Sequence, residues 1–250
     1  MLKLATWNVN GIRARQAQVQ EWIAQERPDV VCLQEIKATS EQVPAALCEM
    51  EGYWCYWHGG KAYSGVALHV SKAFAPERPF FAHPAFDYES RIVTVDVGDL
   101  TVASIYVPNG GKDFPGKMTF LDAMDAYAAS FQGTARQVAL MGDMNVARTD
   151  RDVHPKERKP RAIGQLPEER AVIERILSRG LVDVGRALDP DNDGLFTWWA
   201  PWRNMRQRNI GWRLDHVFAS EALAARAIAC PVQKEIGTSD HAPVVATFTV

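Results

Sequence analysis

Apolar runs of strand length alternate along this chain with stretches in which apolar residues recur at helical spacing. Two of the runs, 92–97 and 101–107, are separated by a turn that contains Gly98 and Asp99, which predicts a β-hairpin. Such antiparallel pairing excludes a purely parallel, doubly wound sheet. Mixed strands interleaved with helices predict an α/β fold, a layered sandwich of two packed mixed sheets with helices outside.

The remaining elements follow from the same periodicities. The other predicted strands cover residues 2–7, 30–33, 66–70, 138–141, 214–218 and 244–250. The predicted helices have apolar stripes at Val19, Trp22 and Ile23, at Phe120, Met124, Tyr127 and Phe131, and at Val172, Ile173, Ile176 and Leu177. Since the 250 residues are 47% hydrophobic and contain no repeat or linker-like tract, residues 1–250 are expected to form a single domain.

Composition also gives expectations about compartment and assembly. Residues 1–9 contain no stretch typical of a signal peptide or a membrane span. The cysteines show no CxxC pairing, which is typical of free thiols and not of a zinc site; they are Cys32, Cys48, Cys55 and Cys230. We therefore expect a cytoplasmic protein without a membrane partner, and a monomer.

Net charge gives no global attraction to nucleic acid, because the formal value is −2. The distribution is uneven, however. Residues 148–161 include six basic and three acidic side chains, and residues 203–213 include four arginines and no acid. These stretches are interpreted either as contacts to phosphate or as ordinary solvated loops.

Polar residues gather where the predicted strands end. Each group has an ordinary explanation, since Asn before Gly forms turns, an isolated Glu is usually exposed, and Asp or Ser can cap a helix. Their repeated occurrence favours one cleft, because strand ends are where open sheets place their sites. The groups occupy 8–11, 34–37, 106–109, 142–145 and 239–241.

These groups match what phosphodiester hydrolysis requires. The carboxylate of Glu35 and the amide oxygens of Asn8 and Asn10 suit Mg²⁺, or Mn²⁺ as its substitute, better than zinc. Asp143 is a candidate to orient or deprotonate water, and Asn109 and Asn145 are candidates to donate hydrogen bonds to phosphate. His241 needs a carboxylate partner, for which Asp215 and Asp240 are both candidates.

Seven ordered stretches resemble the exonuclease III and apurinic/apyrimidinic endonuclease family. They are 6–14, 33–37, 106–110, 142–147, 166–170, 211–215 and 239–243. The resemblance implies a four-layer α/β sandwich, the endonuclease/exonuclease/phosphatase fold. It implies that Glu35 is the principal metal ligand, with Asn10 and Asp240 near the metal. Part of the family has aspartate in place of Asn10, which leaves the exact ligand set open.

The same resemblance implies the other roles in the site. Asp143 would align or activate the attacking water, and His241 paired with Asp215 would bind or polarise the phosphate. Tyr106 would contact the phosphate or assist the leaving group. Asn109 and Asn145 would complete the anion site.

The substrate class is less constrained, because relatives that resemble deoxyribonuclease I, inositol polyphosphate phosphatases and sphingomyelinases share the fold. The arginine-rich stretch beside the tryptophan cluster favours DNA, and the resemblance implies double-stranded DNA with abasic sites or 3′ ends. The alternatives are a phosphoesterase acting on another ester and a catalytically silent DNA-binding relative. The resemblance places Trp198, Trp212 and Leu214 in a pocket for a sugar without its base. The remaining expected DNA contacts are Lys37, Lys112, Arg206 and Arg208, with Trp202 as a wedge in the duplex.

Overall fold

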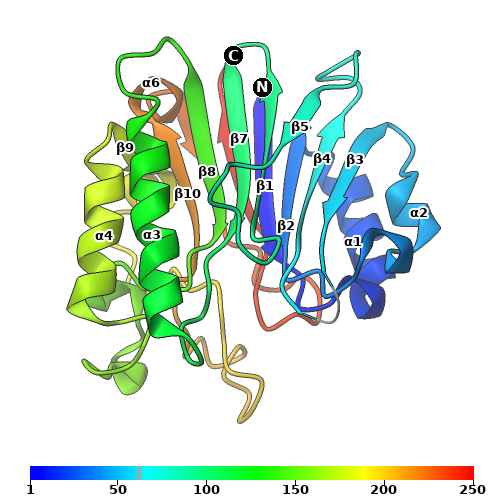
Figure 1. Cartoon of the computed structure of the whole chain (residues 1–250). Coiled ribbons are helices and arrows are strands. Elements are labelled where there is room, and N and C mark those ends of the chain that lie inside the picture. Colours follow the sequence, from blue (N-terminus) through cyan, green and yellow to red (C-terminus); the bar gives the residue numbers. More distant parts are fainter. Residues whose placement is uncertain (61–62) are drawn as a thin grey trace.

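The computed structural model describes residues 1–60 and 63–250 as two six-stranded mixed sheets packed face to face, with helices on both outer faces (Figure 1). The first sheet has the strand order β11-β12-β1-β2-β4-β3. Its strands are β1 (Leu2–Asn8), β2 (Val30–Gln34), β3 (Tyr53–His58), β4 (Val66–Ser71), β11 (Ala227–Ala229) and β12 (Val244–Phe248).

The second sheet has the order β5-β6-β7-β8-β10-β9. Its strands are β5 (Phe80–Ala82), β6 (Ile92–Val97), β7 (Leu100–Tyr106), β8 (Gln137–Asp143), β9 (Leu181–Asp183) and β10 (Asp215–Ser220). The helices are α1 (Ile12–Glu26), α2 (Ala45–Cys48), α3 (Phe114–Ala129), α4 (Pro167–Leu177), α5 (Val184–Leu188) and α6 (Glu221–Ala224), with 3-10 turns η1 (Ser40–Gln42), η2 (Asp150–Asp152) and η3 (Pro155–Glu157).

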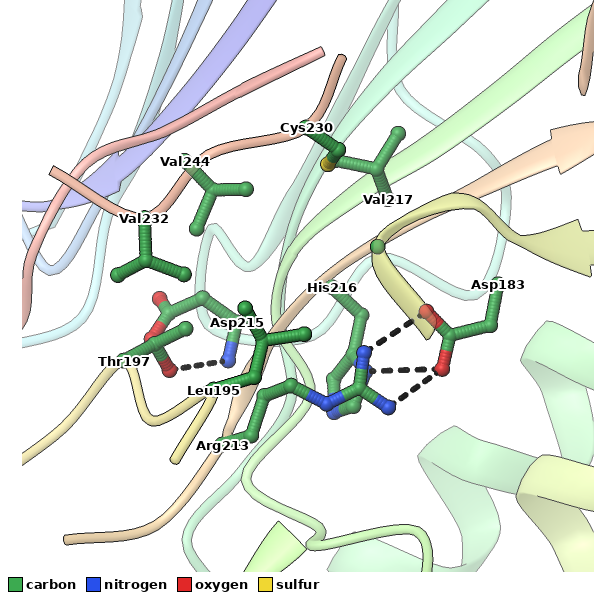
Figure 2. Close-up of a pocket in the computed structure, with 11 residues that line it drawn as sticks. Asp183, Leu195, Thr197, Arg213, Asp215, His216, Val217, Cys230, Val232 and Val244 are labelled. Carbon is green, nitrogen blue, oxygen red and sulfur yellow. Dashed lines mark hydrogen bonds and ion pairs between the residues drawn. The ribbon is translucent and has the colours of Figure 1, made fainter. Parts of the chain in front are cut away.

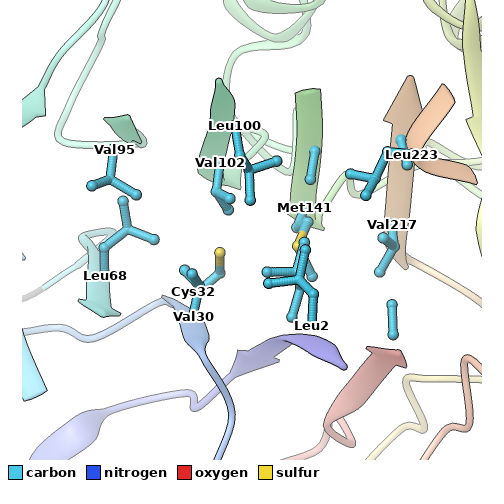
Figure 3. Close-up of a cluster of buried hydrophobic side chains, with 14 of the residues drawn as sticks. Leu2, Val30, Cys32, Leu68, Val95, Leu100, Val102, Met141, Val217 and Leu223 are labelled. Atoms are coloured by element: carbon cyan, nitrogen blue, oxygen red, sulfur yellow. The ribbon is translucent and has the colours of Figure 1, made fainter. Parts of the chain in front are cut away.

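The main core lies between the sheets. Leu68 and Cys32 of the first sheet face Val95 and Met141 of the second, and these side chains are buried (Figure 3). Two further apolar clusters lie outside the sheets. One joins α3 and α4 to the second sheet and the other joins α1 to the first. The expected helical stripes therefore cover opposite outer faces of the sandwich, and the four-layer expectation is confirmed.

Strand register brings the polar strand ends together. Asn8 pairs with Gln34 in the parallel β1–β2 ladder. In the other sheet Tyr106 pairs with Asp143, and Asp143 pairs with Asp215. The two sheets meet at this end through a hydrogen bond from Asn8 to Asp143. Both chain termini lie at the opposite end of the sandwich (Figure 1).

The expected β6–β7 hairpin is confirmed. Strands β3, β5, β9 and β11 were not expected from the sequence. Three of them contain only three residues each, too few for a pattern to be read. In β3, every residue is half-buried, so burial does not alternate between the two faces of the strand, and the sequence carries no period-two pattern there. Within the described residues, no helix is both long and apolar enough to cross a bilayer.

Candidate active site

A pocket of about 390 Å³ opens at the end of the sandwich where β1, β7 and β8 finish. Carboxylate, amide and imidazole groups line one part of it, and aromatic side chains line another. Its lining residues are Glu35, Tyr106, Asn109, Asp143, Asn145, Ile163, Trp198, Trp212, Leu214, Asp240 and His241. All of these except Ile163 were expected in the site from the sequence. Strand ends that are far apart in the chain thus converge on one cleft.

His241 lies between two buried carboxylates. Its Nδ1 atom is 2.8 Å from Oδ2 of Asp215, and its Nε2 atom is 3.8 Å from Oδ2 of Asp143. Because Asp143 and Asp215 are paired on β8 and β10, the sheet register sets the spacing of this row. Of the two carboxylates expected as the partner of His241, the structure places Asp215 in contact with the imidazole.

The pKa values of Asp143 and His241 are shifted far from their usual ranges. Burial raises the pKa of Asp143 to about 7; the charge of His241 opposes this change and the charge of Asp215 adds to it. Burial disfavours protonated His241, but the Asp215 and Asp143 carboxylates outweigh burial and raise its pKa to about 10. The imidazole is therefore a cation at neutral pH, and Asp143 can take up or release a proton near neutrality.

A second polar cluster joins Glu35, Lys37, Asn10 and Asp240. The Lys37 ammonium lies 2.8 Å from Oε1 of Glu35 and 2.6 Å from Oδ1 of Asn10. Asn10 in turn donates to Oδ1 of Asp240 over 2.7 Å. The oxygens of Glu35 and Asn10 thus both contact the Lys37 ammonium. The three candidate ligands, Glu35, Asn10 and Asp240, would offer oxygen atoms to a metal. This donor set fits a hard divalent cation such as Mg²⁺.

Two predicted residues of this region contact other groups of the site. Asn8 was expected as a metal ligand, but its side chain is buried, donates to Oδ2 of Asp143 over 2.9 Å and accepts from the backbone N–H of Asn10. This geometry makes Asn8 a support for Asp143. Lys37 was expected to contact substrate, whereas here it neutralises Glu35.

Tyr106 and two asparagines occupy the adjoining wall. Burial raises the pKa of Tyr106 well above its usual range, and the nearby carboxylates of Glu35 and Asp143 add to the effect, so the phenol stays protonated. Asn109 donates to the amide oxygen of Asn145 over 3.3 Å. The Asn145 amide donates to the Val107 carbonyl over 2.8 Å, which holds the two asparagines in one orientation.

The backbone at these strand ends is unusual. Asn10, Glu35, Lys37 and Asn145 all have a positive φ, between 44° and 54°. Such left-handed conformations are costly for residues with a side chain and tend to persist where function needs them. At Gly142, φ is 143°, and a Cβ atom would lie 1.9 Å from a backbone oxygen of the neighbouring strand β7. Only glycine therefore lets β8 approach β7 directly before Asp143.

Aromatic side chains form the apolar part of the pocket. Trp198 and Trp212 pack edge to face with centroids 5.7 Å apart, and Leu214 lies beside them. The indole N–H of Trp198 donates to Oδ2 of Asp240 over 2.9 Å, which connects this wall to the polar cluster. The neighbouring Trp199 is buried, as alternation along an extended segment predicts. Trp202 is 60% exposed.

Comparison with known proteins identifies the family of this chain. Residues 5–241 match the Endonuclease/Exonuclease/phosphatase family. The chain belongs to this family. Exodeoxyribonuclease III of Haemophilus influenzae is 33% identical over 99% of this chain and 100% of its own length. Recombination repair protein 1 of Drosophila melanogaster is 32% identical over the whole of this chain, which spans 37% of that relative's length.

Two solved structures superpose closely on this chain. The structure of an AP endonuclease from Archaeoglobus fulgidus covers 100% of both chains at a TM-score of 0.90 and 30% identity. The structure of the 3′ phosphatase NExo from Neisseria bound to product DNA hairpin gives the same coverage and TM-score at 32% identity.

The basic residues of this family member divide into two kinds. The Arg206 guanidinium donates to the carbonyls of Lys234, Ser239 and Ile236 over 2.6, 2.6 and 2.8 Å. This geometry favours a structural role for Arg206 over the expected contact with phosphate. Arg208 and Lys112 are exposed beyond the pocket.

A buried ion pair beneath the asparagines was not expected from the sequence. Lys117 and Glu169 are fully buried, with Nζ 2.5 Å from Oε1. The same ammonium donates to the carbonyls of Asn145 and Asn109 over 2.7 and 3.3 Å. The pair therefore ties α3 and α4 to both asparagines of the pocket wall. Its only sequence signal was the stretch 166–170, for which no role had been assigned.

Thr197 was also missed. Its hydroxyl accepts a hydrogen bond from the backbone N–H of Leu214 over 2.9 Å. It also accepts one from the backbone N–H of Asp215 over 3.0 Å (Figure 2). Beside it, Arg213 forms a two-pronged ion pair with Asp183 at 2.8 and 2.6 Å. Arg213 is therefore a buried residue with a structural contact, although it belongs to the arginine-rich stretch 203–213.

Proposed function

We propose that this chain is a metal-dependent DNA repair nuclease that hydrolyses phosphodiester bonds at abasic sites and at 3′ ends. The observation that carries the proposal is the Asp143, His241 and Asp215 row facing Glu35 across one pocket. It combines a group able to accept a proton near neutral pH with a cation able to bind an anion. Hydrolysis of a phosphate ester needs both.

In the proposed reaction, the oxygen of water bonds to phosphorus while the bond from phosphorus to the 3′ oxygen breaks. Asp143 accepts the proton of the attacking water. Protonated His241 holds a non-bridging phosphate oxygen, and Asp215 keeps the imidazole charged and oriented. Tyr106, which stays protonated, is placed to donate to phosphate or to the leaving oxygen.

The metal site of the proposal consists of Glu35 with Asn10 and Asp240. A bound Mg²⁺ ion, or Mn²⁺ in its place, would supply positive charge to the phosphate oxygens. The convergence of the Glu35 and Asn10 oxygens on the Lys37 ammonium supports a cation at this point. Asn8 contributes indirectly by orienting Asp143.

The proposed substrate is double-stranded DNA. Support comes from the pocket wall of Trp198, Trp212 and Leu214, which offers an apolar surface to a sugar that has lost its base. The names of the relatives, an exodeoxyribonuclease, an AP endonuclease and a 3′ phosphatase with product DNA, agree with both proposed uses of the site. We also propose a cytoplasmic monomer, in keeping with the four free thiols.

Cleavage of a duplex with one abasic site, with and without Mg²⁺, tests the proposal. Release of nucleotides from the 3′ ends of a matched undamaged duplex tests the second use, and an inositol polyphosphate tests the alternative phosphoesterase. We expect nicking of the abasic strand that requires Mg²⁺. Tight binding of the abasic duplex without any metal-dependent cleavage would instead identify a silent DNA-binding relative.

A further inference from the structure

Three metal-ligating side chains outside the catalytic pocket meet near the end of strand β3. His58 is the last residue of β3, and His83 directly follows β5 of the other sheet. Asp87 lies in the loop that leads to β6. One ligand atom from each of these residues lies within 4.8 Å of the other two. None of the three lines the active-site pocket.

Hydrogen bonds orient two of the three groups, Asp87 and His83. Oδ1 of Asp87 accepts the backbone N–H groups of Arg91 and Ile92 over 2.8 and 3.1 Å, and Oδ2 faces Nε2 of His58 at 2.5 Å. Nδ1 of His83 lies 3.4 Å from the Ile92 carbonyl, and its Nε2 atom lies 2.7 Å from the Tyr56 hydroxyl, a contact that a metal ion bound to Nε2 would replace. Such outer contacts fix the orientation of ligands in protein metal sites.

The imidazoles lie against each other, with ring centroids 3.8 Å apart. Two imidazoles with one carboxylate differ chemically from the oxygen cluster around Glu35. They suit zinc and neighbouring transition metals, which accept nitrogen and oxygen ligands with open positions left for water.

We propose that His58, His83 and Asp87 form a second metal site, selective for a zinc-class divalent ion and separate from the catalytic centre. The ion replaces the proton shared by His58 and Asp87. Bonds of about 2.0 to 2.2 Å require these ligand atoms to separate by several tenths of an ångström, which side-chain rotation provides. Because the ligands come from the outer strand of one sheet and the strand-to-strand loop of the other, the ion cross-links the two sheets.

Titration of the full chain with Co²⁺, and with Zn²⁺ in competition, tests this site. Excess Mg²⁺ is kept present to favour occupation of the oxygen cluster by Mg²⁺. We expect one equivalent of Co²⁺ to give visible d–d absorption, displaced by Zn²⁺, and Zn²⁺ to raise the melting temperature. His83→Ala and Asp87→Asn should each weaken binding by more than about tenfold.

Two further variants locate the bound ion. His154→Ala removes an unrelated histidine and should leave the titration unchanged. His241→Asn alters the catalytic row, and Co²⁺ binding should survive this change. Absence of stoichiometric binding to the wild type would overturn the proposal, as would equal binding by His83→Ala and the wild type, or loss of binding in His241→Asn. None of these three results depends on a measurement of nuclease activity.

Discussion

Nδ1 of His241 and Oδ2 of Asp215 lie 2.8 Å apart on buried side chains, and this contact determines how the site responds to pH. Asp143, with a pKa raised to about 7, must lose its proton to act as a base. His241, with a pKa raised to about 10, must keep its proton to hold phosphate. Activity should therefore rise as pH increases through about 7 and fall as pH approaches about 10.

Asp215→Asn tests this assignment. Removing the carboxylate removes the main charge that raises the pKa of His241 and one that raises the pKa of Asp143. Both limbs of the pH profile of kcat/KM should move to lower pH, the basic limb by about one unit or more. A profile measured on one abasic duplex at constant salt and Mg²⁺ checks this. An unmoved basic limb would remove His241 from its assigned role.

The sequence predicted the members of the row. The residue pattern alone left two partners open for His241, and only the family resemblance named Asp215. The choice depends on the pairing of Asp143 with Asp215 across β8 and β10, which no local pattern encodes. The role of Asn8 likewise depends on a contact between the two sheets. Glu35 was easier, because a polar residue that ends a buried strand is visible in the sequence itself.

The contacts of the basic residues also could not be predicted from the sequence alone. A run of arginines reveals charge but not direction, so Arg206, Arg208 and Arg213 look equivalent in the sequence. In the fold, Arg213 is buried against Asp183 and Arg206 donates to carbonyls. Lys117 gave no signal, because a buried lysine on a helix is recognised only with its Glu169 partner in place.

Substitutions of Asp143 and Glu35 should reduce activity in different ways. Asp143→Asn removes the proton acceptor, so kcat should fall by several orders of magnitude while DNA affinity changes little. Glu35→Ala removes a metal ligand, so activity should recover in part at high Mg²⁺ or Mn²⁺. Single-turnover rates across a metal titration separate the two effects. Near wild-type turnover by Asp143→Asn would refute its role as the base.

Substitutions of Arg206 and Arg208 should have different effects on the salt dependence of DNA affinity. Arg208→Ala should lower the slope of log affinity against log salt by up to about one unit, because an exposed arginine can neutralise a phosphate. Arg206→Ala should leave the slope unchanged and cost about 1 to 3 kcal/mol of stability, since three carbonyls lose their donor. DNA-binding isotherms and urea unfolding of both variants provide the measurement. A lowered slope for Arg206→Ala would restore its phosphate contact.

The Lys117 and Glu169 pair should stabilise the fold and the pocket wall together. Lys117→Met leaves the buried Glu169 carboxylate without its partner, which typically costs about 3 to 5 kcal/mol. It also removes the donor to the Asn109 and Asn145 carbonyls, so KM for DNA should rise even where the variant remains folded. Lys117→Arg is the matched control that keeps the charge. Equal stability of Lys117→Met and the wild type would exclude this role.

The pocket wall should select abasic nucleotides through its shape. Trp212 packs edge to face on Trp198, and both line the pocket with Leu214, so Trp212→Ala enlarges the space that would receive a base-free sugar. A nucleotide without a base has no stacking or pairing to lose when it leaves the helix, an advantage of a few kcal/mol that a narrow apolar pocket preserves by excluding intact nucleotides.

Trp212→Ala should therefore lower the ratio of abasic to normal incision more than it changes the Mg²⁺ dependence, which belongs to the Glu35 cluster. Trp202→Ala is the matched comparison, because Trp202 is exposed and was expected to act as a wedge in the duplex. If Trp202 is a wedge, its loss should weaken binding of both duplexes and leave the pocket's preference in place. Incision of abasic and normal duplexes by the two folded variants, at one salt and Mg²⁺ concentration, gives both ratios. An unaltered ratio for Trp212→Ala would mean that these aromatic side chains serve the core and that abasic preference arises elsewhere.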